Sequence, residues 1–207
     1  SRVLPVISGL TQLGIPVSID TQKPNLMKEA IDSGACLVND ISGAQTPEVA
    51  ALVARTGVGI CVMHMQGAPD RMQKNPSYDD VIREVFNFLS AKVTTLIRAG
   101  VSSNQIVIDP GFGFGKKLEH NIALLRHLDR FREIGHPILV GLSRKSMLGF
   151  ITEKQDPTDR LGSSIAAAIF AFRKGADIVR VHDVNETRDA LVAWQFMSDK
   201  PKSEESQ

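Results

Sequence analysis

A short apolar segment followed by a segment of helical periodicity occurs six times along this chain, and few folds accommodate that alternation. The apolar segments lack the period-two pattern of half-buried strands, which is typical of parallel strands covered on both faces. The predicted strands are residues 15–20, 36–40, 59–65, 106–109, 137–143 and 177–183. The predicted helices are residues 2–13, 23–33, 47–55, 78 or 79–99, 119–134, 160–173 and 186–197. The alternation predicts an α/β protein with a parallel sheet.

Two features favour a closed eight-fold barrel over an open doubly wound sheet. Polar residues follow every predicted strand, and barrels collect catalytic groups from many strand ends, whereas open sheets concentrate them at one switch point. No glycine-rich dinucleotide fingerprint follows the first strand. The polar residues at the strand ends are Asp20, Asn39, Asp40, His64, Asp109, Ser143, His182 and Asp183. With six βα units and a leading helix, we expect a TIM (β/α)8-type barrel lacking its first strand, first helix and second strand.

Composition agrees with one globular barrel domain over residues 1–197. An apolar fraction of 43% is enough for a large core, and a formal net charge of +1 gives no field suited to nucleic acid or a membrane surface. No apolar run is long enough to span a bilayer, and no signal pattern is present. Cys36 and Cys61 lack metal-like spacing, so we expect reduced thiols in a cytoplasmic protein. The polar tail, residues 198–207, is predicted to be disordered.

The segment 106–117 is the first candidate for a ligand site. It reads Ile-Val-Ile-Asp-Pro-Gly-Phe-Gly-Phe-Gly-Lys-Lys, so Asp109 ends a strand that Pro110 and Gly111 cannot continue. The glycines let the backbone lie close to a ligand, and Phe112 and Phe114 offer flat apolar faces on a flexible loop. These features suit a flat, hydrogen-bonding small molecule. The alternative is an ordinary Asp-Pro-Gly turn.

Three carboxylates, Asp20, Asp40 and Asp109, end the first, second and fourth predicted strands and are expected to converge on one rim. They could bind a metal, accept N–H donors from a nitrogen heterocycle or stabilise a developing cation. A strand-end carboxylate is also a common helix cap, and Asp40 is the one for which this simpler explanation fits best.

Basic residues follow the last two strands. In Ser143-Arg144-Lys145, a cation could pair with Asp109 or meet a ligand carbonyl; a solvated turn is the alternative. Arg180 and His182 are two apart on a strand and therefore share a face, where they could receive a phosphate. The alternative for Arg180 is a structural ion pair with an interior aspartate.

The third strand ends in Met63-His64-Met65, which has no partner at metal-ligand spacing. Methionines fill cores well, and a lone histidine is more often structural than catalytic. We expect Met63 to form an apolar wall of the site.

Six motifs occur in the order found in bacterial dihydropteroate synthases, and the chain resembles that family over all but its tail. The motifs are Ser18-Ile-Asp-Thr21, Asn39-Asp-Ile41, Met63-His-Met-Gln-Gly67, Ile108-Asp-Pro-Gly-Phe-Gly-Phe-Gly-Lys116, Gly141-Leu-Ser-Arg-Lys-Ser146 and Arg180-Val-His-Asp183. The resemblance implies an eight-fold barrel transferase of folate biosynthesis. Such an enzyme joins 6-hydroxymethyl-7,8-dihydropterin diphosphate to p-aminobenzoate with Mg²⁺, is usually a homodimer and is the target of sulfonamides.

The resemblance also implies roles for individual residues. The pterin pocket would consist of Asp20, Asn39, Ile41, Met63, Asp109, Lys145 and Arg180. The diphosphate would be bound by Arg180 and His182, and p-aminobenzoate or a sulfonamide would lie beside Gly113, Phe114 and Ser143. Catalysis would rest on Asp20, Lys145 and Arg180, with Asp20 stabilising a cationic pterin methylene.

The chain lacks two family loops, including the one with the metal-binding asparagine, so no metal ligand is expected among its own residues and its activity alone is open. One alternative is a pterin-dependent methyltransferase domain, against which the Gly-Leu-Ser-Arg-Lys-Ser run argues. Another is an inactive barrel fragment that only binds pterin.

Overall fold

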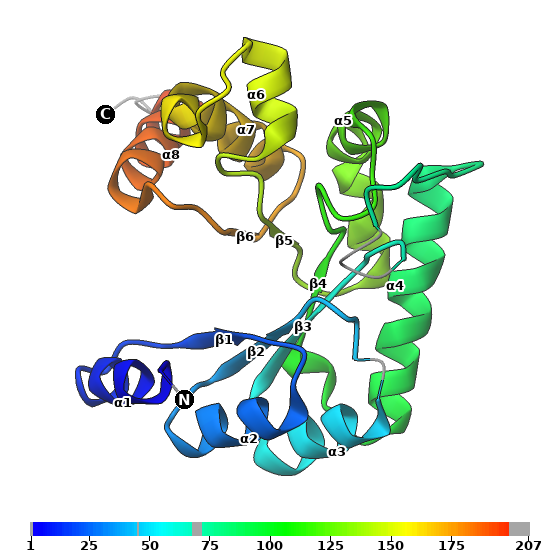
Figure 1. Cartoon of the computed structure of the whole chain (residues 1–207), viewed down its shortest axis with the longest axis vertical. Helices are drawn as coiled ribbons and strands as arrows, with labels where there is room; N and C mark the ends of the chain where they lie inside the picture. The colour runs from blue at the N-terminus through cyan, green and yellow to red at the C-terminus, as the bar shows by residue number, and fades with distance from the viewer. Residues whose placement is uncertain (1, 45, 68–71, 199–207) are drawn as a thin grey trace, which may run out of the picture.

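Six short parallel strands lie at the centre of the molecule, each followed by helical structure, as predicted (Figure 1). The computed structural model describes residues 2–44, 46–67 and 72–198. Within them the strands are β1 (Ser18–Asp20), β2 (Leu37–Asp40), β3 (Gly59–Met63), β4 (Ile106–Asp109), β5 (Leu139–Val140) and β6 (Ile178–Val179). All pairing is parallel and follows the order of the chain, which is the arrangement of a βα barrel.

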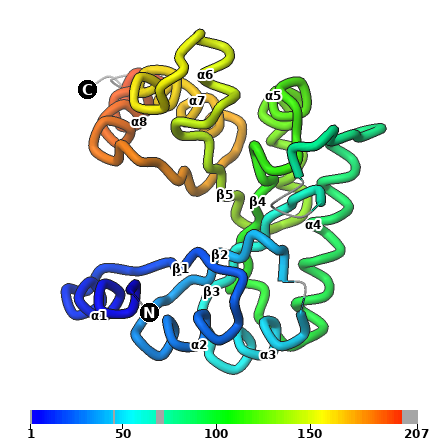
Figure 2. Tube along the Cα trace, in the orientation of Figure 1, coloured from blue at the N-terminus to red at the C-terminus, as the bar shows by residue number. Residues whose placement is uncertain are grey.

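The strands form one arc in two hydrogen-bonded parts. β1 to β4 pair in sequence, β5 pairs with β6, and a parallel bridge between Ile108 and Ile138 joins the parts. Figure 2 shows the trace passing from β1 to β6 with the helices on the outer side. The register places Asp20 beside Asn39 and Met63 beside Asp109. Polar strand ends therefore gather at one edge of the sheet.

The helices cover the strands through apolar faces. They are α1 (Leu4–Gln12), α2 (Pro24–Asp32), α3 (Pro47–Thr56), α4 (Val81–Arg98), α5 (Leu118–Arg126), α6 (Ser146–Thr152), α7 (Leu161–Arg173) and α8 (Val184–Ser198). In α4, Val81, Val85 and Leu89 are buried at helical spacing. Its N-terminus is capped by Asp80, whose carboxylate accepts from the backbone N–H groups of Ile82 and Arg83 at 3.1 and 3.0 Å.

The face of the sheet that packs against the helices is fully buried. Val38, Ile60, Val62, Ile108 and Ile138 are fully inaccessible to solvent. Burying a branched apolar side chain contributes about 1.5–3 kcal/mol, so these strand residues supply much of the folding free energy.

One predicted helix, residues 119–134, is wrong as a single element. The α-helix α5 ends at Arg126, and residues Leu128–Ile134 form a 3₁₀ helix. Leu128, Phe131 and Ile134 are three residues apart, so a 3₁₀ turn places all three on one face. Leu128 and Phe131 are fully buried, and this packing favours the tighter helix.

The loop expected between the fifth strand and residue 160 is also wrong, because it contains α6 and a 3₁₀ turn at Pro157–Arg160. Helix α6 spans only seven residues with Gly149 inside, which hides its periodicity. A further 3₁₀ turn, Ser103–Gln105, precedes β4. Strands β5 and β6 are shorter than predicted because the chain turns away to place residues 141–145 and 180–183 at the rim.

The other bounds agree within a few residues. Helix α8 ends at Ser198, and the predicted disorder of the following tail concerns residues that lie outside the described ones. No helix in the described ranges is both long and apolar enough to cross a bilayer.

Candidate active site at the strand ends

A cavity of about 250 Å³ lies where the strands end. Most of the residues predicted for a ligand site line it: Asn39, Ile41, Met63, Asp109, Phe114, Ser143, Lys145, Arg180 and His182. Gly113 instead lines a neighbouring cavity of about 210 Å³, and Lys145 borders both. Residues from several different strand ends therefore meet in one place, which explains why barrels can assemble a site from distant sequence segments.

Asp109 is buried at the end of β4. One carboxylate oxygen accepts the N–H of Gly111 at 2.7 Å. Burial raises the pKa of Asp109, while Lys145 and the Gly111 N–H oppose the shift. Gly111 has φ of 72°, and a Cβ there would overlap the carbonyl oxygen of His64. Only glycine permits this approach.

The loop between Gly111 and Gly115 is held by hydrogen bonds, contrary to the expectation of flexibility. Tyr78 donates to the carbonyl of Gly115 at 2.7 Å, and the Gly113 N–H donates to Asn121 at 2.7 Å. Phe114 faces the cavity, as predicted. Phe112 does not: its ring is fully buried in the core, where apolar burial outweighs contact with a ligand.

Asp20, Asn39 and Arg180 form a polar chain across the rim. The Asn39 amide donates to Asp20 at 3.1 Å, and Arg180 forms an ion pair with the same carboxylate at 3.0 Å. An ion pair of Arg180 is thus observed, but with the exposed Asp20 and not with an interior aspartate, and Arg180 also lines the cavity. The buried Oδ1 of Asn39 has no hydrogen-bond partner among the described residues. An unsatisfied buried acceptor on a residue that lines a cavity is suited to a ligand donor.

Lys145 brings a cation to the other side of the cavity. Its ammonium donates to the carbonyl of Phe112 and lies 4.7 Å from the centre of the Phe114 ring. Burial lowers the pKa of Lys145 to about 8, although Asp109 opposes the shift. A direct ion pair between Lys145 and Asp109 was one expectation. In the described part of the structure the two side chains make no direct contact of that kind, and each affects the pKa of the other through its charge.

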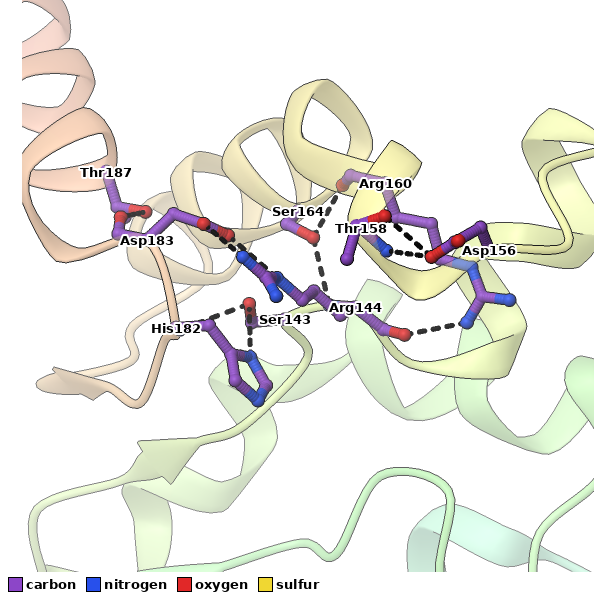
Figure 3. Close-up of polar contacts among 9 residues, drawn as sticks. All are labelled: Ser143, Arg144, Asp156, Thr158, Arg160, Ser164, His182, Asp183 and Thr187. Carbon is purple, nitrogen blue, oxygen red and sulfur yellow. Dashed lines mark hydrogen bonds and ion pairs between the residues drawn. The ribbon is translucent and has the colours of Figure 1, made fainter.

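Two contacts join the turns after β5 and β6 (Figure 3). Ser143 Oγ lies 3.0 Å from His182 Nδ1, and Arg144 donates to both oxygens of Asp183 at 3.1 and 2.5 Å. The hydrogen bond from Arg144 lowers the pKa of Asp183. Arg180 and His182 share the cavity, as their spacing predicted.

Two residues that support this turn were missed by sequence reasoning. Arg160 is buried and donates to the Arg144 carbonyl at 2.7 Å, while Ser164 accepts the Arg144 N–H at 2.9 Å (Figure 3). Together they hold Arg144 at a φ of 60°, a left-handed conformation that costs about 1–2 kcal/mol for a residue with a Cβ. Nothing in the local sequence marks this long-range contact.

Asp40 and His64 have structural roles. Asp40 is fully buried, accepts from the N–H groups of Ser42 and Ala44 at 2.9 Å, and does not line the cavity. It caps the turn after β2 and not a helix as predicted, because the N-cap of α3 is Thr46. The ring of His64 packs edge-on against Phe88 with centroids 4.9 Å apart.

The described part of the chain holds no cluster of three or more His, Cys, Asp or Glu side chains that could bind a metal. Asp20 is paired with Arg180, and Asp183 with Arg144. These carboxylates are therefore already matched with cations.

Comparison with known proteins assigns the chain and its fold to a class. A family model described as pterin binding enzyme matches residues 1–182, so this is a pterin-binding enzyme with a βα barrel. Dihydropteroate synthase of Neisseria meningitidis serogroup C is 46% identical over 200 residues, covering 95% of this chain and 71% of the relative. The Escherichia coli K12 enzyme is 42% identical over 191 residues, covering 92% and 67%. The chain belongs to the dihydropteroate synthase family.

Solved structures agree. Dihydropteroate synthase of Stenotrophomonas maltophilia, with imidazole in its active site, superposes with a TM-score of 0.93 at 46% identity, covering 97% of this chain and 76% of that one. The Thermus thermophilus enzyme in complex with 6HMPPP gives 0.92 at 47% identity, covering 96% and 78%. The predicted family, its barrel fold and its transferase class in folate biosynthesis are confirmed.

Proposed function

We propose that this chain binds the ring of 6-hydroxymethyl-7,8-dihydropterin diphosphate in the rim cavity and takes part in joining it to p-aminobenzoate. Complexes of related enzymes support this substrate pair. The Thermus thermophilus enzyme is known with 4-aminobenzoate and with 6HMPPP, and the Xanthomonas albilineans enzyme with 7,8-dihydropteroate.

The unpartnered Oδ1 of Asn39 is the observation that carries the proposal. Asn39 lines the same cavity as the buried carboxylate of Asp109. A pterin presents an edge of neighbouring N–H donors, and two acceptors in one apolar-walled cavity match such an edge. Ile41 and Met63 form the walls. The alternative of a methyltransferase domain has no specific observation in its favour.

Cations at the opposite side suit the rest of the substrate. Lys145 would interact with the carbonyl and N5 side of the ring. Arg180 would stack on the ring and, with His182, bind the diphosphate. The Arg180 side chain is 62% exposed, so it can follow a ligand without breaking a buried contact.

The chemistry assigned to these residues is substitution at the pterin methylene. The bond between the methylene carbon and the diphosphate oxygen breaks, and Arg180 and His182 receive the leaving anion. Asp20 stabilises the cationic methylene by its charge. The amine nitrogen of p-aminobenzoate then attacks the carbon and loses a proton to solvent. An arylamine is already nucleophilic, so no strong general base is required.

The p-aminobenzoate side is proposed at Gly113, Phe114 and Ser143. Gly113 lies in the second cavity, on the other side of Lys145 from the pterin site. Ser143 is hydrogen-bonded to His182 and therefore borders the diphosphate end. Sulfonamides would compete at this side. The Yersinia pestis enzyme, known in complex with a sulfonamide drug, supports that proposal.

Mg²⁺ does not fit the donor set of the described residues, because Asp20 and Asp183 are paired with arginines and no three-ligand cluster exists among those residues. No step of the proposed reaction is therefore assigned to a metal ion.

We also propose that the chain forms a homodimer and is located in the cytoplasm. A homodimer is supported by large apolar side chains exposed on neighbouring helices, including Phe150 on α6, Phe170 on α7 and Phe196 on α8. A cytoplasmic location is supported by Cys36 and Cys61, both of which are free thiols.

Isothermal titration calorimetry with a dihydropterin tests the pocket. We expect binding by the chain and a loss of at least about tenfold in affinity, near 1.4 kcal/mol, for Asp109→Asn, because the amide replaces an acceptor with a donor. Asp40→Asn is the control, since Asp40 lies outside the cavity, and its fold is checked by circular dichroism. Unchanged affinity in a folded Asp109→Asn chain would contradict the assignment. Turnover with p-aminobenzoate separates an active chain from a binding-only fragment.

A further inference from the structure

Lys116 carries a buried ammonium beneath the glycine loop. Its residue is 4% exposed, and Nζ donates to the carbonyls of Gly111 at 2.8 Å and Phe114 at 3.0 Å. The same nitrogen lies 2.9 Å from His64 Nδ1 and 3.4 Å from the His64 carbonyl. An ammonium has three N–H donors, so three near acceptors use all of them.

His64 provides a rigid support for this ammonium. Because Lys116 has no lone pair when charged, Nδ1 of His64 must accept, which requires the neutral ring. Burial and then the charge of Lys116 lower the pKa of His64 to about 3, so the ring stays neutral. The ring is held edge-on against Phe88 and tilted against Tyr78, with centroids 4.9 and 6.1 Å apart.

The two carbonyls bound by Lys116 lie at opposite ends of the loop that shapes the cavity. At one end, the N–H of Gly111 donates to Asp109, which lines the cavity. At the other end, the ring of Phe114 lines the cavity beside Lys145. The loop backbone also packs tightly on the segment after β3: a Cβ at Gly115 would lie 2.5 Å from the carbonyl oxygen of Gln66.

We propose that Lys116 is a positioning residue for the pterin pocket: by joining both ends of the loop to His64, it sets the placement of Asp109 and Phe114. The expected effect of Lys116 on ligand binding rests on the proposed function. Its effect on the loop does not require any ligand.

Protonation of Lys116 controls this linkage. A neutral amine has two hydrogens and cannot serve three acceptors. Burial lowers the pKa of Lys116 to about 7; Asp109 opposes the shift and Lys145 adds to it. The titratable groups facing Lys116 are His64 at the end of β3, Asp109 at the end of β4 and Lys145 before α6, while α5 contributes the uncharged Asn121. The ammonium is therefore half protonated near pH 7, so the linkage is nearly complete at about pH 6 and is lost as the pH rises above about 7.

The test compares Lys116→Met, which keeps the apolar stem and removes the donors, with Lys117→Met, the adjacent exposed lysine. Hydrogen exchange by mass spectrometry is followed over residues 110–117, and pterin affinity is measured by calorimetry. At about pH 6 we expect exchange in Lys116→Met to be at least about tenfold faster and affinity about tenfold weaker than in Lys117→Met. At about pH 9 the two variants should differ by less than about threefold, because Lys116 is then neutral in the control.

Equal exchange and equal affinity in the two variants at about pH 6 would overturn the proposal. A difference that persists unchanged at about pH 9 would also overturn it, because a purely structural role does not depend on protonation. Both variants are compared at the same pH, so they share the titration of Lys145, whose pKa is about 8, apart from the part that depends on the charge of Lys116.

Two outcomes need separate readouts. If the unsubstituted chain binds no pterin, the proposed function fails, and exchange of the loop amides alone still decides the role of Lys116. If Lys116→Met does not fold, NMR of ¹⁵N-labelled lysine in the unsubstituted chain replaces it. A Lys116 Nζ whose protons exchange with water as fast as those of Lys117 would overturn the proposal.

Discussion

Gly111 shows how one residue determines the shape of the site. Its backbone adopts a φ of 72°, and the position of a Cβ is already occupied by the His64 carbonyl oxygen. The sequence places a glycine after Asp-Pro and predicts a turn, but the contact that makes the glycine necessary comes from a strand end far earlier in the chain. Conformation and space are two separate constraints, and only the first is visible locally.

We expect Gly111→Ala to lower the free energy of unfolding by at least about 3 kcal/mol, because the methyl group must displace backbone rather than a flexible side chain. Gly57→Ala is the matched control. Gly57 has a similar φ of 74° at the end of α3, with nothing within 4 Å of the Cβ position, so the cost should be only about 1 kcal/mol. Urea denaturation of both variants gives the comparison. Equal costs would mean that φ alone requires the glycine.

At the scale of elements, the chain segment after β5 depends on the start of α7 more than on its own sequence. The guanidinium of Arg160 donates to the carbonyls of Arg144, Lys154 and Gln155 at 2.7, 3.0 and 2.5 Å. Through Arg160, these hydrogen bonds link the turn that precedes α6 to the segment that follows it. Lys145, the proposed pterin ligand, lies directly beside that turn. Its position therefore depends on a residue that does not contact the cavity.

Replacing the buried Arg160 with Met should remove three hydrogen bonds to backbone carbonyls, at a cost of about 3 kcal/mol in the free energy of unfolding. Pterin affinity should fall as well, since Lys145 loses its fixed placement. Arg173→Met, at the C-terminal end of α7, should cost less than about 1 kcal/mol and leave affinity unchanged. Denaturation and calorimetry on both variants check this. An Arg160→Met chain with normal affinity would mean that α6 holds Lys145 by itself.

At the scale of the molecule, α6, α7 and α8 lie together (Figure 1). Each of these helices carries apolar side chains that are exposed to solvent. Phe196 is 85% exposed and Phe150 is 74% exposed. Large apolar residues that are exposed on adjacent helices suit a surface that another chain covers. In the proposed homodimer, a second copy of the chain covers these side chains of α6, α7 and α8.

Sedimentation velocity should show a species of twice the 22.6 kDa chain mass that Phe196→Asp converts to monomer, because a charge buried in an apolar interface is strongly unfavourable. Leu13→Asp, at a residue that is 75% exposed at the end of α1 and away from these helices, should leave the dimer intact. Dissociation by both variants, or a dimer that survives Phe196→Asp, would place the interface elsewhere.

Much of the candidate site could be predicted because strand ends carry their own signals. Asp109, Asn39 and Arg180 stand at the boundary between an apolar run and a turn, and parallel strands bring such positions to one rim. The errors fell where tertiary contacts outweigh local pattern. Phe112 packs into the core instead of against a ligand, and Leu128–Ile134 forms a 3₁₀ helix because its apolar residues are three apart.

Periodicity and short motifs were enough to establish the α/β class, the order of the strands, the family and most residues of the pocket, because each of these depends on patterns within a few residues. Which polar groups are satisfied emerged only from the folded chain. The contact of Lys116 with His64 and the hydrogen bond from Arg160 to Arg144 each join segments that are remote in the chain. The unpartnered acceptor of Asn39 is likewise visible only in the folded chain. Hydrogen-bond partners are set by distances of about 3 Å, and only the folded backbone brings such groups that close.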